Sequence, residues 1–148
     1  MWPVIAAGRS DVPSWLEIVR EVEPLFGPMP DFDATLSRNI DRASAVCVRD
    51  PDGEVLGAML LRVGPPGEIA WLAVRSTARR RGVGSALVAE ALRRLPAAPV
   101  VTVDTFGEDN IDGRPARRLY EGFGFVAAEH LERGPEGGTR QRFRLRSP

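Results

Sequence analysis

The stretch of residues 68–87 constrains the fold of this chain more than any other. It begins with the mostly apolar run Glu68–Val74, which indicates a strand buried on both faces. An Arg-x-x-Gly-x-Gly turn follows, formed around Arg79, Gly82 and Gly84, and apolar residues then recur at helical spacing. A helix that begins directly after such a turn has N–H groups without acceptors in its first turn. The stretch therefore predicts a site for an anion such as a phosphate.

The spacing of the glycines separates this turn from a dinucleotide-binding fingerprint. Gly82 and Gly84 lack a Cβ atom, so an anion can approach the backbone there. The fingerprint needs a third glycine, but Leu87 occupies that position, and no acidic residue follows at the distance expected for a ribose ligand. A Rossmann fold is therefore not favoured.

Composition excludes several other kinds of site. The chain has 148 residues with 20 basic and 20 acidic side chains, and every basic one is Arg. Without Lys there is no Walker A loop, Schiff base or Ser-Lys nucleophile. Cys47 and His130 are the only residues of their types, so we expect no internal disulfide and no metal site. We expect Cys47 to be a core thiol and His130 to lie on the surface.

The balanced charge and the apolar runs bear on partners and location. A net charge of zero gives no overall field that attracts nucleic acid or anionic lipid, so we expect neither partner. The apolar runs are far shorter than the ~20 residues of a membrane span. The N-terminus lacks the features of a secretion signal, and we therefore expect no membrane association and a cytoplasmic location.

The pattern along the chain predicts one α/β (α+β) domain over residues 1–148. Prolines 24, 28 and 30 favour a loop over residues 23–33. We expect helices from Ser10 to Val22, from Asp33 to Arg42, from the glycine turn to Pro96, and from Ala116 to Gly122. We expect strands over Val4–Ala7, Ala45–Arg49, Val55–Val63, Glu68–Val74, Val100–Thr105, Phe123–Ala128 and Arg140–Arg146.

A second motif, Ala116-Arg-Arg-Leu-Tyr120-Glu-Gly-Phe-Gly-Phe125, follows the glycine turn. Together the two motifs resemble those of the GCN5-related N-acetyltransferases, the GNAT family. The resemblance covers residues 45–128, the expected acetyl-CoA-binding core, and the N-terminal helices only in layout. It implies a V-shaped, mixed but mostly antiparallel sheet of six to seven strands, with about four helices on both faces.

The resemblance also implies an enzyme, an acetyl-CoA-dependent N-acetyltransferase. Such an enzyme transfers the acetyl group to a primary amine of a small molecule or peptide by direct attack in a ternary complex. One departure from the family pattern concerns the cofactor: Gly113 stands where the family often has Asn, and Asn110 nearby is a substitute. The residues implied to bind acetyl-CoA are Leu72, Ala73, Val74, Arg79, Arg80, Arg81, Gly82, Val83, Gly84, Ser85, Asn110, Ala116 and Tyr120.

Two residues are implied to be catalytic. Tyr120 would donate a hydrogen bond or a proton to the leaving thiolate. Since a thiol has a pKa of about 8.5 and a tyrosine about 10, full proton transfer is uphill, and stabilisation of the sulfur is the safer role. Glu68 would accept the proton of the acceptor amine, often through water, and Asp104 is a weaker candidate.

Several alternatives stay open at this level. The chain could be a non-catalytic acyl-CoA-binding or regulatory module, or a protein that binds another phosphate ligand. Tyr120 and Trp71 could be core aromatics only, and Arg79, Arg80 and Arg81 a solvated run. Phe26 and Met29 could line an acceptor pocket or only fix their loop. The sequence leaves the acceptor amine and homodimerisation open.

Overall fold

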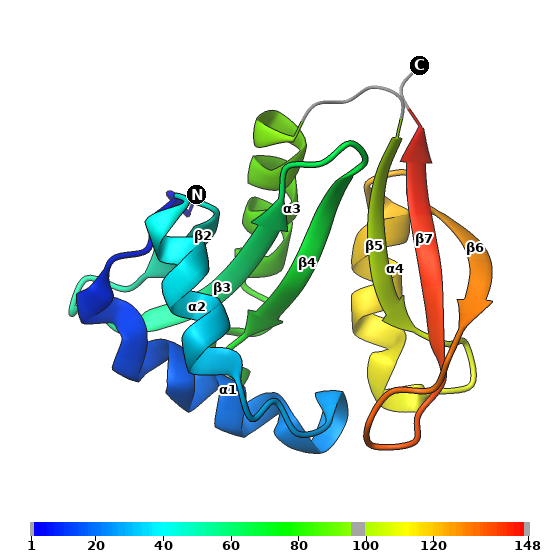
Figure 1. Cartoon of the computed structure of the whole chain (residues 1–148), viewed down its shortest axis with the longest axis horizontal. Helices are drawn as coiled ribbons and strands as arrows, with labels where there is room; N and C mark the ends of the chain where they lie inside the picture. Colours follow the sequence, from blue (N-terminus) through cyan, green and yellow to red (C-terminus); the bar gives the residue numbers. More distant parts are fainter. Residues whose placement is uncertain (1, 96–99, 147–148) are drawn as a thin grey trace.

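The computed structural model describes residues 2–95 and 100–146. Its seven strands form one sheet in the order β1-β2-β3-β4-β5-β7-β6 (Figure 1). The strands are β1 (Ile5–Ala6), β2 (Ala45–Arg49), β3 (Val55–Arg62), β4 (Gly67–Val74), β5 (Val100–Phe106), β6 (Val126–Leu131) and β7 (Arg140–Arg146). The helices are α1 (Val12–Phe26), α2 (Phe32–Asp41), α3 (Val83–Arg94) and α4 (Arg114–Gly122). The predicted fold class is confirmed.

The sheet is V-shaped because β4 and β5 pair over only part of their length. Among the described strand pairs, β4 with β5 is parallel and the others are antiparallel. The parallel pairing joins residues 67–69 to residues 101–103 and goes no further. Beyond it the two strands diverge, as Figure 1 shows, and the edges that face each other have no strand partner among the described residues.

Helices cover both faces of the sheet. In Figure 1, α1 and α2 lie in front of β2, β3 and β4, while α3 and α4 lie behind. On the front face, Trp15 and Ile18 of α1 have no exposed surface, and burial of such side chains stabilises the fold by roughly 1.5–3 kcal/mol each. Cys47 lies in the same cluster with no exposed surface, which confirms a core thiol, and burial raises its pKa to about 11. His130 is exposed, as predicted.

The predicted loop over residues 23–33 is wrong in its first part, because α1 continues through Pro24 to Phe26. Pro24 has no N–H to donate to the carbonyl four residues earlier, so α1 loses one hydrogen bond there, and the contacts of Phe26 with Trp71 and Phe106 favour the helix despite that loss. The helix then ends at Gly27, whose φ of +88° suits glycine and whose N–H donates to the Glu23 carbonyl at 2.7 Å. This extension carries Phe26 to the diverging edges of β4 and β5.

Two other expectations need correction. The strand expected from Phe123 begins at Val126, because a turn with Gly124 at φ +94° follows α4 and the Tyr120 carbonyl accepts from the N–H groups of Phe123 and Phe125. The strand Glu68–Val74 is only partly buried, since its second half borders the opening of the V. Pro96, expected to end α3, lies outside the described residues.

In the described part of the chain, no helix has the length and apolar character that crossing a membrane requires.

Candidate active site

A cleft of about 760 Å³ lies where β4 and β5 diverge. It is lined from both strands, from the turn before α3, from α4, from the end of α1 and from the loop between β6 and β7. The predicted residues that line it are Leu72, Ala73, Val74, Arg79, Arg80, Gly82, Val83, Gly84, Ser85, Ala116 and Tyr120. The fold thus brings most of the predicted cofactor residues, and one predicted catalytic residue, to a single cavity.

One end of the cleft is the N-terminus of α3. Gly82 is the residue before the helix and has a φ of +84°, a conformation that favours glycine. The first helical hydrogen bond runs from the Ala86 N–H to the Gly82 carbonyl at 3.0 Å. The N–H groups of Val83, Gly84 and Ser85 precede it, so they have no helical acceptor and are free to bind an anion.

The middle of the cleft is the free edge of β4. The pairing of β4 with β3 matches Trp71 to Leu60 and Ile69 to Leu61, which leaves Ala70 as a β-bulge. On its other side, β4 pairs with no strand of the described chain after Ile69. Backbone N–H and C=O groups at such an edge are available to an extended ligand. Leu72, Ala73 and Val74, which the family resemblance implied as acetyl-CoA-binding residues, lie on this part of β4.

Tyr120 lies on α4 and lines the cleft while only 4% of its surface is exposed. Its ring meets Phe125 edge to face, with centroids 5.8 Å apart. Burial raises the pKa of the Tyr120 hydroxyl above the ordinary tyrosine value. The hydroxyl therefore stays protonated through the physiological pH range, which suits a hydrogen-bond donor and makes full transfer of its proton more difficult.

The opposite end of the cleft has an aromatic wall. Phe26 meets Trp71 of β4 with centroids 6.0 Å apart and Phe106 of β5 with centroids 5.6 Å apart, so it connects the two arms of the V. Met29 lines the same end. Phe26 and Met29 thus form part of a pocket wall, and Trp71 is both a core residue and a wall residue.

The charged groups at this end are held in ion pairs. Asp104 of β5 accepts hydrogen bonds from Arg142 at 2.7 and 3.0 Å. Arg140 of β7 lies with its guanidinium carbon 4.8 Å from the centre of the Phe106 ring, and it pairs with Glu136 at 2.6 Å. Asp104 and Arg140 both line the cleft.

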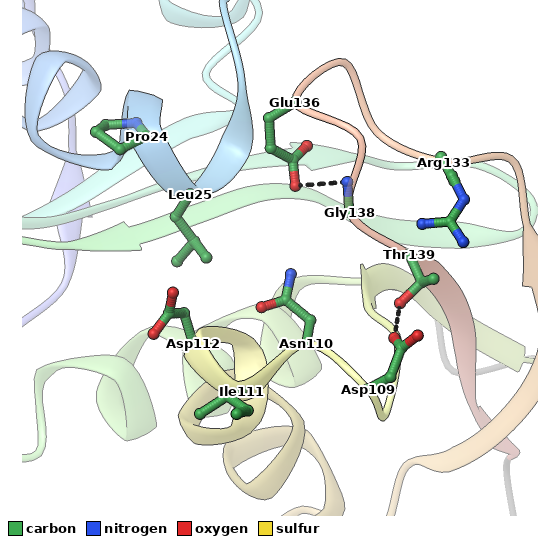
Figure 2. Close-up of a pocket in the computed structure, with 10 residues that line it drawn as sticks. All are labelled: Pro24, Leu25, Asp109, Asn110, Ile111, Asp112, Arg133, Glu136, Gly138 and Thr139. Carbon is green, nitrogen blue, oxygen red and sulfur yellow. Dashed lines mark hydrogen bonds between the residues drawn. The ribbon is translucent and has the colours of Figure 1, made fainter.

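A second, more polar pocket of about 410 Å³ opens beside the aromatic end. Figure 2 shows it between the end of α1, the turn that carries Asn110 and the β6–β7 loop. Leu25 and Asp112 line both cavities, so the polar pocket lies next to the cleft. Asp109, Glu136 and Arg133 add charge to its walls.

Three predicted site residues lie outside the lining of the cleft, as the described residues define it. Glu68 forms an ion pair with Arg62 on β3. Arg81 is exposed, and its guanidinium lies over the Trp2 ring. Asn110 uses its side-chain oxygen to accept from the Gly113 N–H at 3.2 Å, which caps a 3-10 turn at Ile111–Gly113.

Other lining residues were missed by sequence reasoning. Phe106 and Arg140 belong to strands whose pairing puts them directly opposite each other, which only the register of the sheet reveals. Ala70 carries no signal of a bulge. The three prolines at residues 24, 28 and 30 indicated a segment of restricted conformation. They did not show that the Leu25 side chain would line the cleft.

Across residues 2–95 and 100–146, no three His, Cys, Asp or Glu side chains are grouped so that they could hold a metal ion.

Comparison with known structures agrees with this geometry. A GNAT-family acetyltransferase from Bacillus cereus has a TM-score of 0.76 and 21% identity, over 100% of this chain and 99% of that one. The NatC complex bound to Gag peptide and CoA gives 0.82 and 18%, over 99% and 98%. The spermidine N-acetyltransferase from Vibrio cholerae, in complex with CoA and spermine, gives 0.73 and 16%, over 97% and 94%. At these identities the likeness shows the fold.

The family itself is shown by sequence. The model of the Acetyltransferase (GNAT) family matches residues 12–125, which include both motifs, whereas no curated protein matches the chain. The match confirms the enzyme class that the motifs implied, an acetyl-CoA-dependent N-acetyltransferase. This chain belongs to the GNAT acetyltransferase family.

Proposed function

We propose that the protein binds acetyl-CoA in the cleft between β4 and β5 and transfers its acetyl group directly to a primary amine bound at the aromatic end. The observation that carries the proposal is the combination, in one cavity, of free helix N–H groups, an open strand edge and a buried tyrosine. These three features match the three parts of the donor: its pyrophosphate, its pantetheine arm and its thioester.

The donor is held mainly by backbone groups in this proposal. The N–H groups of Val83, Gly84 and Ser85 bind the pyrophosphate, and the positive end of the α3 dipole adds to the attraction. Arg79 and Arg80 supply positive charge at the same end. The free edge of β4 at residues 72–74 binds the pantetheine arm as a further strand would. Arg81 and Asn110 act indirectly, by shaping the two loops that flank the donor.

Tyr120 stabilises the leaving thiolate. As the acceptor nitrogen attacks the carbonyl carbon, the new C–N bond forms, the C–S bond breaks and negative charge develops on sulfur. A buried hydroxyl that stays protonated donates a hydrogen bond to that charge, and the interaction is stronger in the transition state than in the ground state.

The proton of the attacking amine leaves through water in this mechanism. Glu68 remains the proposed acceptor of that proton, although its ion pair with Arg62 and its position outside the cleft lining require a water chain. Asp104 lines the cleft and is the alternative, but both of its oxygens accept from Arg142. The proposal also includes a cytoplasmic location, a reducing compartment in which the buried thiol of Cys47 would stay reduced.

Calorimetry combined with a CoA-release assay tests the proposed function. Acetyl-CoA should bind more tightly than ATP, and CoA should be released when a broad panel of primary amines is added. Preference for ATP would contradict the donor assignment. Binding of acetyl-CoA without turnover of any amine would favour a non-catalytic acyl-CoA-binding module.

A further inference from the structure

The acceptor end of the cleft is specific enough to indicate a class of substrate. Resting on the function proposed above, we infer that the acceptor is an α-amine whose carbon carries an aromatic or large aliphatic side chain. Such an amine occurs in an amino-acid amide and at the N-terminus of a peptide, and both sources share the same chemistry at the site.

The first argument is the wall itself. Trp71 is backed by Trp15, whose ring stacks at 6.0 Å, and by Phe32 at 4.7 Å, so the indole is held in place from behind. Phe26 meets Trp71 and Phe106 edge to face, and the three rings form a continuous apolar surface across the V. A surface already formed in this way binds an apolar side chain without reorganisation.

The second argument is that this aromatic surface is covered, because the end of α1 and the β6–β7 loop meet over it. At Gly27 an added Cβ would come within 3.0 Å of the Glu136 backbone nitrogen, so the end of α1 and the β6–β7 loop approach closely. Arg140 fixes this approach, because it pairs with Glu136 at 2.6 Å and reaches the Phe26 carbonyl at 3.4 Å. The roof turns the aromatic wall into a pocket, which fits a single side chain better than an extended one.

The third argument is the distribution of charge. The carboxylates that line the cleft are Asp104, which is paired with Arg142, and Asp112, which is exposed at the rim. Arg140 places a cation beside the aromatic wall, and Arg79 lies toward the donor end. A second ammonium group inside the pocket would lie near the like charge of Arg140, and the Asp104 carboxylate is already paired with Arg142, which disfavours polyamines.

The polar pocket beside the aromatic wall is lined by charged residues rather than apolar ones. In Figure 2, Asp109, Asp112 and Glu136 surround the polar pocket, with Arg133 as the opposing cation. Because Glu136 is paired with Arg140, the attraction for a protonated amine comes mainly from Asp109 and Asp112, and the inner apolar wall then favours the neutral form of the amine. The polar pocket also leaves room for the carboxamide or peptide group that follows the α-carbon.

The pKa of the acceptor amine is the fourth argument, and it favours the same class of substrate. At pH 7 about one α-amine in seven is already neutral, whereas about one lysine-like amine in 2,500 is neutral. Glu68 and Asp104 are both paired with arginines, which makes either one a weaker proton acceptor for a strongly basic amine. An acceptor with a low pKa needs the least help from either.

A panel of defined amines tests this inference at saturating acetyl-CoA. The panel contains L-phenylalaninamide, glycinamide, spermidine, Nα-acetyl-lysinamide and the tripeptide amide Phe-Gly-Gly. Because the chain has no Lys, no side-chain amine of the enzyme competes as an acceptor. We expect kcat/KM for phenylalaninamide to exceed that for glycinamide, spermidine and acetyl-lysinamide by about tenfold or more. The rate with the tripeptide relative to phenylalaninamide identifies the source of the α-amine, and either value supports the class.

A charge-matched pair of variants locates the selectivity. Met29→Glu adds a carboxylate to the pocket wall and should reduce the preference for phenylalaninamide over spermidine by about fivefold or more. Val126→Glu adds the same charge on β6, where Val126 is 67% exposed, and should leave the preference unchanged. Thermal unfolding and acetyl-CoA binding report whether both variants are folded.

The outcomes separate this inference from the proposed function. Faster turnover of glycinamide, spermidine or acetyl-lysinamide than of phenylalaninamide would overturn the acceptor class while leaving acetyl transfer intact. An unchanged preference in a folded Met29→Glu variant would also overturn it. Failure to bind acetyl-CoA by calorimetry would overturn the proposed function, and the acceptor class with it.

Discussion

The indole Nε1–H of Trp2 donates a hydrogen bond of 2.6 Å to the carbonyl oxygen of Arg81, and the Arg81 guanidinium carbon lies 5.2 Å from the centre of the Trp2 ring. This contact joins the start of the chain to the turn before α3. Arg80, one residue earlier in that turn, has a φ of +63°, and Gly82, one residue later, has a φ of +84°. Trp2 thus holds a turn whose backbone conformation is otherwise costly.

Removing that hydrogen bond should weaken donor binding. In Trp2→Phe the ring remains beside Arg81 but the N–H is lost, and a hydrogen bond of this kind contributes about 0.5–1.5 kcal/mol. We expect the KM for acetyl-CoA to rise about twofold to tenfold with kcat unchanged. Steady-state kinetics measures both, and a wild-type KM would show that the contact does not position the turn.

The glycines of the turn should matter more than its side-chain charge. A Cβ at Gly84 would come within 3.1 Å of the Leu119 side chain and would stand among the free N–H groups, so Gly84→Val should raise the KM for acetyl-CoA by about tenfold or more. Arg80→Ala, the matched control, should change it less than about threefold. A larger effect of Arg80→Ala than of Gly84→Val would show that the side chain, not the backbone, binds the donor.

The two candidate bases can be distinguished by substitution. Glu68→Gln should reduce kcat/KM more for a high-pKa amine than for an α-amine, and its deficit should shrink as the pH rises from 6 to 9, because the amine then loses its proton unaided. Asp104→Asn is the comparison, since Asp104 lines the cleft. If Asp104→Asn shows this pH-dependent deficit and Glu68→Gln does not, the base is Asp104.

The ion pair between Asp11 and Arg49 predicts a pH dependence of stability. Asp11 is 5% exposed, it accepts from Arg49 at 2.6 and 2.7 Å and from the Gly8 N–H, and the Arg49 hydrogen bonds hold its pKa below the usual value of 3.8. Because the folded pKa is lowered, the stabilisation is complete above pH of about 4 and is lost as the pH falls through the folded pKa.

Urea unfolding measures this contribution. Asp11→Asn should cost about 2–3 kcal/mol at pH 7, less than a fully buried pair because 32% of the Arg49 side chain is exposed, and the difference from wild type should narrow below pH 4. Asp41→Asn, which breaks an exposed pair with Arg9, should cost less than about 1 kcal/mol. Equal costs for the two variants would contradict the account.

The local parts of the site were predictable and the long-range parts were not. The turn around Gly82 and Gly84 and the position of Tyr120 follow from residues adjacent in sequence. The contact of Trp2 with Arg81 joins residues 79 apart, and that of Arg140 with the Phe26 carbonyl joins residues 114 apart. Such contacts depend on sheet order and register, which no local pattern specifies.

The acceptor pocket shows the same division in one element. Pro24 was read as ending a helix, yet α1 continues past it and places Phe26 against β4 and β5. Helix propensity predicts poorly where tertiary packing stabilises the helix. Here the contacts of Phe26 with Trp71 and Phe106 provide that stabilisation. The rule that proline ends a helix therefore gave the wrong conformation for the segment that places Phe26 in the pocket wall.

The most direct test of acetyl transfer in this cleft is the kcat of Tyr120→Phe, measured on one amine from pH 6 to 9 with both substrates saturating. The substitution keeps the packing against Phe125 and removes only the hydroxyl. We expect kcat to fall by about tenfold to 100-fold, at or below the lower end of the ~10²–10⁴ range of general-acid catalysis, with the KM for acetyl-CoA unchanged. The ratio of variant to wild-type kcat should stay constant with pH, because burial keeps the hydroxyl protonated throughout. A wild-type kcat at every pH would remove Tyr120 from the reaction and contradict the proposed mechanism.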